Sequence, residues 1–180
     1  HFGQLLFDWF CYSLFELGRL HADPHPGNFL FMPDGRLGVL DFGCTRVVSA
    51  QFRETLTGPW NALLNHGSPA ALRLPSVELQ LVPAELSQAD FDDKVMPVLA
   101  PFVDWQLEPF RAARCDSATR SALPKVDTAR LRTLTALNCG IHPDLPYFDR
   151  AYMGIMQLLK TLGANVRTRN RWITIDEGCA

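Results

Sequence analysis

Cysteines are few in this sequence, and none of them stands in a metal-binding spacing. The five cysteines are odd in number, lie scattered over 180 residues and form no CxxC pair. This argues against a disulfide framework or a zinc ribbon and favours a reducing compartment. Long apolar runs are missing too, since no stretch approaches the roughly 18 residues that span a bilayer. The opening residues, HFGQLLFDWF, carry no basic leader. We therefore expect no signal peptide and a cytoplasmic location.

A large excess of positive or negative charge is also missing. Charged residues make up 20% of the chain and the formal net charge is −2, while 47% of the residues are hydrophobic. These values are ordinary for a globular protein and give no general electrostatic reason to bind nucleic acid. The length suffices for one well-packed domain.

Two short motifs carry the clearest chemistry, and both lie in residues 21–43, HADPHPGNFLFMPDGRLGVLDFG. His21 and Asp23, with Asn28 five residues after the aspartate, have the spacing of a kinase catalytic loop. Asp41, followed by Phe42 and Gly43, has the form of a magnesium-binding DFG turn.

The segment between the two motifs predicts a β-hairpin. Residues 29–32 and 36–40 are short apolar runs rich in strand-forming residues. Pro33-Asp34-Gly35 joins them, and proline suits the second position of a type I turn as glycine suits the fourth. Such a hairpin returns Asn28, at its entry, and Asp41, at its exit, to the same end. Side-chain oxygens are the ligands that Mg²⁺ or Mn²⁺ prefers, so we assign Asn28 and Asp41 to the metal. Asp23, free of metal, is the candidate catalytic base.

Two plainer interpretations stay open for these residues. Asp23 and Asp41 could be turn formers only, because aspartate is common in turns. His21 and His25, four residues apart, could suggest a zinc pair on a helix. Pro24 and Pro26 argue against that helix, and no cluster completes four ligands. We assign His21, His25, Gly27 and Gly43 to support of the loop.

HADPHPGN, followed at this distance by LDFG, resembles the UbiB/AarF/ADCK family of atypical protein-kinase-like ATPases. The later segment PDLPYFDRAYMGIMQLLKTLGANV resembles the C-terminal part of bacterial relatives. The resemblance implies Mg–ATP binding, with phosphoryl transfer or ATP hydrolysis. It further implies a role around ubiquinone or isoprenoid-lipid metabolism, with a small lipid-like substrate or a membrane surface as partner. Leu30 and Leu40, beside the metal ligands, are expected to form the floor under adenine.

The expected fold is mainly α with a small β-hairpin, a protein-kinase-like C-terminal lobe over residues 1–180. Residues 1–20 are expected as a helix leading into the catalytic loop, and residues 44–180 as a helical subdomain. Helices are predicted over 3–20, 49–65, 70–74, 128–137 and 148–162, with several short or kinked ones after Ser87 because of Pro97, Pro101 and Pro109. Residues 114–125 are predicted to be loop.

Motifs that a complete nucleotide site needs are absent from the sequence. No GxGxxG or comparable phosphate loop precedes a VAIK-like strand, so the N-lobe is expected to be absent and this segment alone inactive. No APE motif follows the DFG turn either, and only about five residues precede the next predicted helix. Two alternatives therefore remain: a small-molecule kinase of the aminoglycoside or choline type, and a non-catalytic pseudokinase fragment.

Overall fold

The computed structural model describes residues 1–125, 132, 135–137 and 140–175. Within these residues the fold is mainly helical, with three antiparallel sheets of two strands each. The mainly helical class and the hairpin are therefore confirmed, and two strand pairs that the sequence did not predict form in addition. The chain divides into two compact units. The first comprises His1–Arg53, Ala112–Arg120 and Pro143–Arg169; the second comprises Glu54–Arg111, Ser121–His142 and Asn170–Ala180.

The elements follow one another in a simple order. The α-helices are α1 (Phe2–Cys11), α2 (Ala50–Leu64), α3 (Arg73–Glu78), α4 (Gln88–Asp90), α5 (Met96–Leu107) and α7 (Leu145–Thr161). The strands are β1 (Arg19–His21), β2 (Phe29–Phe31), β3 (Leu37–Val39), β4 (Thr45–Val47), β5 (Arg114–Asp116) and β6 (Asn165–Arg167). Short 3₁₀ segments cover Pro26–Asn28, Phe42–Cys44, Pro69–Leu72 and Glu108–Phe110, and π-helical segments cover Tyr12–Glu16 and Phe91–Val95.

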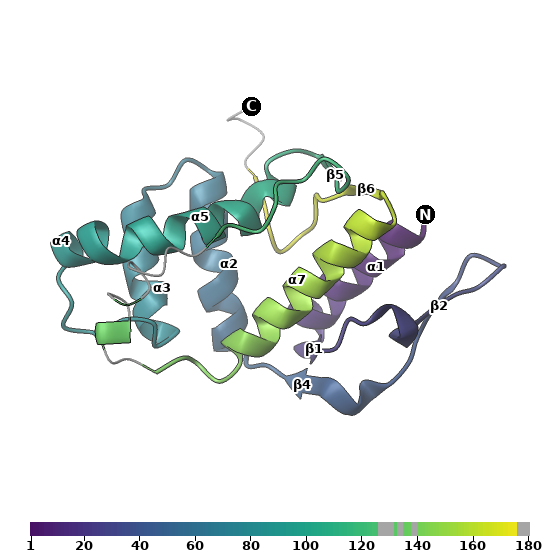
Figure 1. Ribbon diagram of the computed structural model, residues 1–180, viewed down its shortest axis with the longest axis horizontal. Coiled ribbons are helices and arrows are strands. Elements are labelled where there is room, and N and C mark those ends of the chain that lie inside the picture. The colour runs from purple at the N-terminus through teal and green to yellow at the C-terminus, as the bar shows by residue number, and fades with distance from the viewer. Residues whose placement is uncertain (126–131, 133–134, 138–139, 176–180) are drawn as a thin grey trace. The chain divides into compact units, whose positions relative to one another are not determined.

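Helices α1 and α7 lie side by side and form the core of the first unit (Figure 1). Each has apolar side chains at helical spacing that are almost fully buried. These are Leu6, Phe7, Phe10 and Leu14 on and after α1, and Phe148, Tyr152, Ile155 and Leu159 on α7. Gln4 joins α1 to the edge of β6, because its side chain accepts from the backbone N–H of Arg167 at 2.7 Å and donates to its carbonyl at 3.0 Å.

The first helical stretch ends at Gly18. The sequence predicts a helix over residues 3–20 with Gly18 as the residue that ends it, and Gly18 adopts a φ of 60° before the chain enters strand β1. A left-handed φ is open to glycine without steric cost and terminates a helix. Strand β1 pairs antiparallel with β4, which places the start of the catalytic loop beside the end of the DFG turn.

The hairpin between the two motifs forms as predicted. Strands β2 and β3 pair antiparallel, with Phe29 opposite Val39. The backbone N–H of Gly35 donates to the carbonyl of Met32 at 2.9 Å, which closes the turn through Pro33 and Asp34. Gly35 has a φ of 87°, a conformation that side chains with a Cβ rarely adopt.

In the second unit, caps and prolines determine where helices begin and break. The Ser87 hydroxyl accepts from the backbone N–H of Asp90 at 3.1 Å, which caps α4. The chain from residue 88 to 110 is divided among four helical segments, so the prediction of several short helices is confirmed. Buried side chains of Leu72, Val82, Phe91 and Val95 form a core within this unit.

Two predictions for the later part of the chain are wrong, and a third falls mostly on residues that the structure does not describe. Residues 114–116, expected as loop, form β5 and pair with β6. The final helix begins at Leu145, three residues before the predicted Phe148, since Pro146 suits the first turn of a helix. The predicted helix over 128–137 lies outside the described residues for most of its length.

Candidate active site

The catalytic loop, residues 22–28, starts where β1 ends, so the β1–β4 pairing determines its position. The backbone N–H of Ala22 donates to the carbonyl of Cys44 at 3.1 Å, directly after the DFG turn. Inside the loop, the backbone N–H of His25 donates to the carbonyl of Asp23 at 2.7 Å. The loop therefore turns sharply beside residues 41–43.

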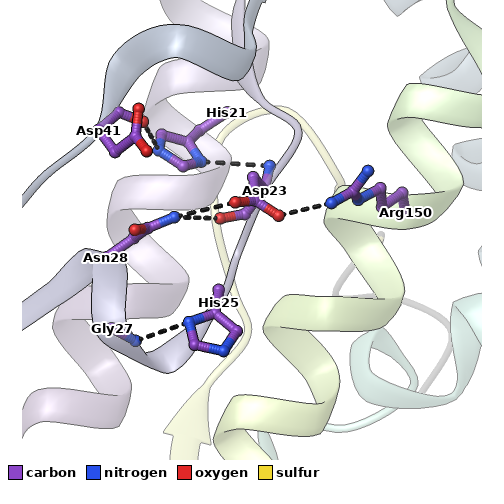
Figure 2. Close-up of polar contacts among 7 residues, drawn as sticks. All are labelled: His21, Asp23, His25, Gly27, Asn28, Asp41 and Arg150. Carbon is purple, nitrogen blue, oxygen red and sulfur yellow. Dashed lines mark hydrogen bonds and ion pairs between the residues drawn. The ribbon is translucent and has the colours of Figure 1, made fainter.

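Asp23 and Asn28 close this loop on itself. The Asn28 amide nitrogen donates to the backbone carbonyl of Asp23 at 2.9 Å and to its Oδ2 at 3.2 Å (Figure 2). Because the nitrogen is directed at Asp23, the side-chain oxygen of Asn28 is the atom that remains for a cation. The loop thus places a half-buried carboxylate and an amide side by side.

Asp41 lies at the exit of the hairpin. The backbone N–H of Leu40 donates to the carbonyl of Asn28 at 2.8 Å, which brings the two ends of the hairpin together as predicted. Asp41 adopts a left-handed φ of 52°, and its Oδ1 accepts from the backbone N–H of Gly43 at 3.1 Å. Aspartate is one of the few residues other than glycine that adopt this conformation routinely. The residue is exposed, so a hydrated cation can reach its carboxylate.

His21 connects the two motifs through its imidazole ring. Its Nε2 donates to the backbone carbonyl of Asp41 at 2.9 Å, and its Nδ1 accepts from the backbone N–H of Asp23 at 3.4 Å. A carbonyl can only accept and a backbone N–H can only donate, so these partners assign the tautomer with the proton on Nε2. The residue is buried, with 6% of its surface exposed.

Aromatic side chains hold the His21 ring in place. Trp9 of α1 and Phe42 of the DFG turn lie edge-on to it, with ring centroids at 5.7 Å and 5.9 Å. The ring of Phe29 lies at 6.3 Å. Such edge-to-face contacts stabilise aromatic pairs beyond simple burial. The orientation of His21 is therefore determined by packing as well as by hydrogen bonds.

The other residues assigned to loop support lie in the two tight turns. His25 accepts at Nδ1 from the backbone N–H of Gly27 at 3.1 Å (Figure 2). A Cβ at Gly27 would lie 3.2 Å from that nitrogen, and a Cβ at Gly43 would lie 3.1 Å from Oδ1 of Asp41. Both turns are thus tight enough to favour glycine. Their effect on activity stays a prediction.

Leu30 and Leu40 lie on the hairpin on either side of the metal-ligand candidates. Their exposed fractions are 46% and 43%. The two apolar side chains are therefore accessible to a ligand, and their assignment to the adenine site stays a prediction.

Arg150 is a site residue that sequence reasoning missed. Its Nη2 lies 2.5 Å from Oδ1 of Asp23, and it reaches the loop from α7 (Figure 2). The two residues are 127 positions apart, and the arginine lies in the segment that resembles the C-terminal part of bacterial relatives, outside the two catalytic motifs. The α7 periodicity predicts which face is buried, but it does not predict what that helix lies against.

Helix α7 is also joined to the strand that follows the DFG turn. Arg46 of β4 forms an ion pair with Asp144, the N-cap residue of α7. The hydrogen bond to Asp144 raises the pKa of the Arg46 guanidinium above its usual value. The same guanidinium lies 4.4 Å from the ring centroid of Tyr147.

The donor set at this site suits a hard cation that also binds a nucleotide. Asn28 and Asp41 offer one amide and one carboxylate, and Mg²⁺ is commonly held by one or two such groups together with water and substrate phosphates. Within the described part of the chain, no group of three or more His, Cys, Asp or Glu side chains is arranged to hold a metal by itself. A cation here would therefore depend on the phosphates for further ligands.

Comparison with known families agrees with this geometry. Residues 1–73 match the ABC1 atypical kinase-like domain, and that span contains the catalytic loop, the hairpin and the DFG turn. The first 73 residues are thus similar to the ABC1 atypical kinase-like domain, and parts of the chain are similar to proteins named as ABC1 and aarF domain kinases. The resemblance seen in the sequence is therefore confirmed.

Proteins similar to this chain occur in plants and cyanobacteria. It is 36% identical over 90 residues to the chloroplastic protein ACTIVITY OF BC1 COMPLEX KINASE 3 of Arabidopsis thaliana, which covers 47% of this chain and 13% of the relative. An uncharacterised Synechocystis protein, sll0005, is 27% identical over 92% of this chain and 26% of its own length. An uncharacterised chloroplastic aarF domain-containing protein kinase of A. thaliana is 67% identical over 31 residues, 17% of this chain and 4% of that protein.

A solved structure has the same fold. The complex of Rv3197 with erythromycin from Mycobacterium tuberculosis superposes with a TM-score of 0.65 at 22% identity, over 92% of this chain and 40% of that one. At this identity the likeness concerns the fold alone. The chain thus spans less than half of the solved chain and at most 26% of the curated proteins named above.

No helix in the described residues has the length and apolar character to cross a bilayer. The plant relatives carry "chloroplastic" in their names, whereas a cytoplasmic location was expected from this sequence. That expectation stays a prediction.

Proposed function

We propose that this chain supplies the catalytic loop and the metal-binding turn of a Mg–ATP site, at which a phosphoryl group passes from ATP to a small acceptor or to water. The supporting observation is the hydrogen-bonded series Asn28–Asp23–His21–Asp41. It gathers a carboxylate suited to accept a proton with two oxygen ligands suited to a hard cation, which is what phosphoryl transfer requires of a protein.

Asp23 orients the attacking oxygen in this proposal. The oxygen of water or of an acceptor hydroxyl attacks the γ-phosphorus of ATP, the bond from that phosphorus to the β,γ-bridging oxygen breaks, and ADP leaves with the electron pair. The proton of the attacking oxygen passes to the Asp23 carboxylate. The 32% exposure of the Asp23 side chain is consistent with this, because a substrate can reach the carboxylate.

Asn28 and Asp41 hold Mg²⁺ or Mn²⁺ through their side-chain oxygens. When bound, the cation neutralises charge on the phosphates. Leu30 and Leu40 contribute apolar surface to the adenine. The phosphate loop and the lysine that contacts the α/β-phosphates are expected from an N-lobe outside these 180 residues, because the sequence contains neither motif.

A small acceptor fits this site better than a peptide. After Gly43 the chain enters β4 at Thr45, which pairs with β1, and helix α2 begins at Ala50. No long segment is available there to dock a polypeptide. The solved structure of the same fold is a complex with erythromycin, so a small-molecule ligand occurs among proteins of this fold. A lipid-like acceptor near ubiquinone metabolism, or at a membrane surface, is the finer form of this proposal.

Titration of the full-length protein with ATP tests the metal site. Calorimetry with Mg²⁺ should show binding that is lost in EDTA and in an Asp41→Ala variant. Asp34→Ala is the matched control, because Asp34 is an exposed aspartate at the tip of the same hairpin. Asp23→Asn should keep ATP affinity and lose turnover, since it removes a contact needed mainly in the transition state. Equal affinity in EDTA, or Asp41→Ala binding as well as wild type, contradicts the proposal.

A pseudokinase that binds nucleotide without turnover remains the alternative. It predicts that wild type binds ATP in a Mg-dependent way but shows no turnover that depends on Asp23. The same set of variants therefore distinguishes the two.

A further inference from the structure

Helix α7 brings a guanidinium group to the candidate base from a distant part of the sequence. Arg150 Nη2 lies 2.5 Å from Oδ1 of Asp23, while the Asn28 amide nitrogen lies 3.2 Å from Oδ2 (Figure 2). Each carboxylate oxygen thus has its own donor. Two donors on two oxygens determine the plane of a carboxylate, as one donor does not.

A glycine lets α7 approach the loop closely enough for this contact. A Cβ at Gly154 would lie 2.2 Å from Cγ of Pro24, the residue after Asp23. Gly154 and Arg150 are four residues apart, so they share a face of the helix. The rigid Pro24 ring cannot swing aside as a flexible side chain could. This face of α7 is therefore shaped to the catalytic loop.

A second contact fixes the same helix at its N-terminus. Asp144, the N-cap of α7, forms an ion pair with Arg46 on the strand after the DFG turn. Helix α7 thus touches both halves of the candidate site, and its register against the loop is determined at two points.

The contact between Arg150 and Asp23 contributes little to folding stability. The two side chains are 63% and 32% exposed, and ion pairs of this kind are weak because water competes and salt screens them. A role in the chemistry of Asp23 is the better account, because the contact orients the one carboxylate expected to receive a proton.

We propose that Arg150 is a positioning residue for phosphoryl transfer, which holds the Asp23 carboxylate toward the attacking oxygen. This inference rests on the function proposed above and adds a residue from outside both sequence motifs. The loop itself has no basic residue between His21 and Asn28 other than His25, so α7 provides the only guanidinium that the described residues place on Asp23.

Kinetics of Arg150 variants in the full-length protein test this inference. Arg150→Ala should lower kcat by about 10- to 100-fold, as small misplacements of reacting groups do. KM for ATP and the melting temperature should stay unchanged. Arg150→Lys should recover part of kcat, and added guanidinium ion should partly restore Arg150→Ala, because the site is open to solvent. In the Asp23→Asn background, Arg150→Ala should have no further effect.

Glycine variants separate the placement of α7 from the arginine itself. Gly154→Ala should lower kcat as Arg150→Ala does, because the helix must move away from Pro24. Gly58→Ala in α2 is the control, since a Cβ there meets no heavy atom within 4 Å and alanine favours a helix.

Each outcome decides between defined alternatives. If Asp23→Asn abolishes turnover while Arg150→Ala keeps the wild-type kcat, the inference is wrong and the proposed function stands. If Arg150→Ala raises kcat, the ion pair restrains the base and the inference is again wrong. If wild type shows no turnover that depends on Asp23, the proposed function fails and the inference fails with it.

Discussion

The imidazole of His21 donates to the backbone carbonyl of Asp41 at 2.9 Å. Through its other nitrogen the same ring accepts from the backbone N–H of Asp23. The base candidate and the metal-ligand candidate are thus connected by one buried side chain. A change at His21 should therefore affect both, although His21 itself touches neither carboxylate.

Replacing His21 with phenylalanine tests this connection. The variant keeps an aromatic ring against Trp9 and Phe42 but loses the hydrogen bonds to the carbonyls of Leu40 and Asp41 and from the N–H of Asp23. The loss of these part-buried hydrogen bonds should lower the free energy of unfolding by about 1 kcal/mol, and Mg–ATP affinity should fall. Urea unfolding and calorimetry measure the two effects.

His25→Ala is the control for the His21 variant. His25 is exposed and caps only the short turn before Asn28, so its loss should have the smaller effect on stability and on affinity. The interpretation of His21 is wrong if the two variants behave alike.

The 180-residue chain by itself should bind Mg–ATP weakly and show no saturable turnover. It carries the proposed base and the proposed metal ligands, but its sequence has no phosphate loop and no strand lysine for the α/β-phosphates. A steady-state ATPase assay on the isolated chain, with Asp23→Asn beside it, measures this. Robust magnesium-dependent hydrolysis that Asp23→Asn abolishes would show that the missing motifs are not needed.

Peptides should be poor acceptors for the full-length protein. The chain passes from Gly43 into β4 and then into α2 without a segment that could form a peptide platform. Radiolabelled ATP with a broad peptide library, run beside an ATPase assay, tests this expectation. Efficient phosphorylation of peptides that depends on Asp23 would contradict this prediction and indicate an ordinary protein kinase.

Cys11 and Cys44 should differ sharply in reactivity. Cys11 is 2% exposed, and burial, with a smaller effect of nearby Asp8, raises the pKa of its thiol far above its usual value. Cys44 is exposed. Iodoacetamide should therefore modify Cys44 in the native protein and Cys11 only after unfolding, because the thiolate is the reactive form. Peptide mapping by mass spectrometry distinguishes the two sites, and equal labelling of native protein contradicts the prediction.

The raised pKa of Cys11 also has a consequence for stability at alkaline pH. The folded thiol stays protonated where the unfolded one ionises, so its contribution is fully present below the unfolded pKa and falls as the pH rises above it. Wild type should therefore lose its stability advantage over Cys11→Ala in alkaline solution. Denaturant unfolding of both proteins across this pH range measures the difference, and a constant difference contradicts it.

Local signals in the sequence are enough to predict several turns, caps and helix ends. The turn at Pro33–Gly35, the cap at Ser87 and the helix end at Gly163, whose φ is 55°, all depend on a few neighbouring residues. Such features follow from backbone preferences, so they can be inferred without knowledge of the fold. The return of Asn28 and Asp41 to one end of the hairpin belongs to the same class.

Long-range pairings could not be inferred in this way. Strands β1, β4, β5 and β6 have three residues each, too few for a periodic pattern to show. The contact between Arg150 and Asp23 depends on how α7 packs, and an exposed arginine on a helix has no distinguishing mark in a single sequence. Both misses concern partners far apart in the chain, whose meeting is decided by tertiary packing.

The reach of α7 into the loop also bears on how genes of this kind are assessed. A premature stop codon anywhere between residues 74 and 149 would leave HADPHPGN and LDFG intact, and the whole segment that matches the ABC1 domain would still be translated. The product would nevertheless lack the guanidinium beside Asp23 and the helix that packs on α1. A search by motif would score such an allele as intact, although helix α7, which packs against its catalytic loop, would be lost.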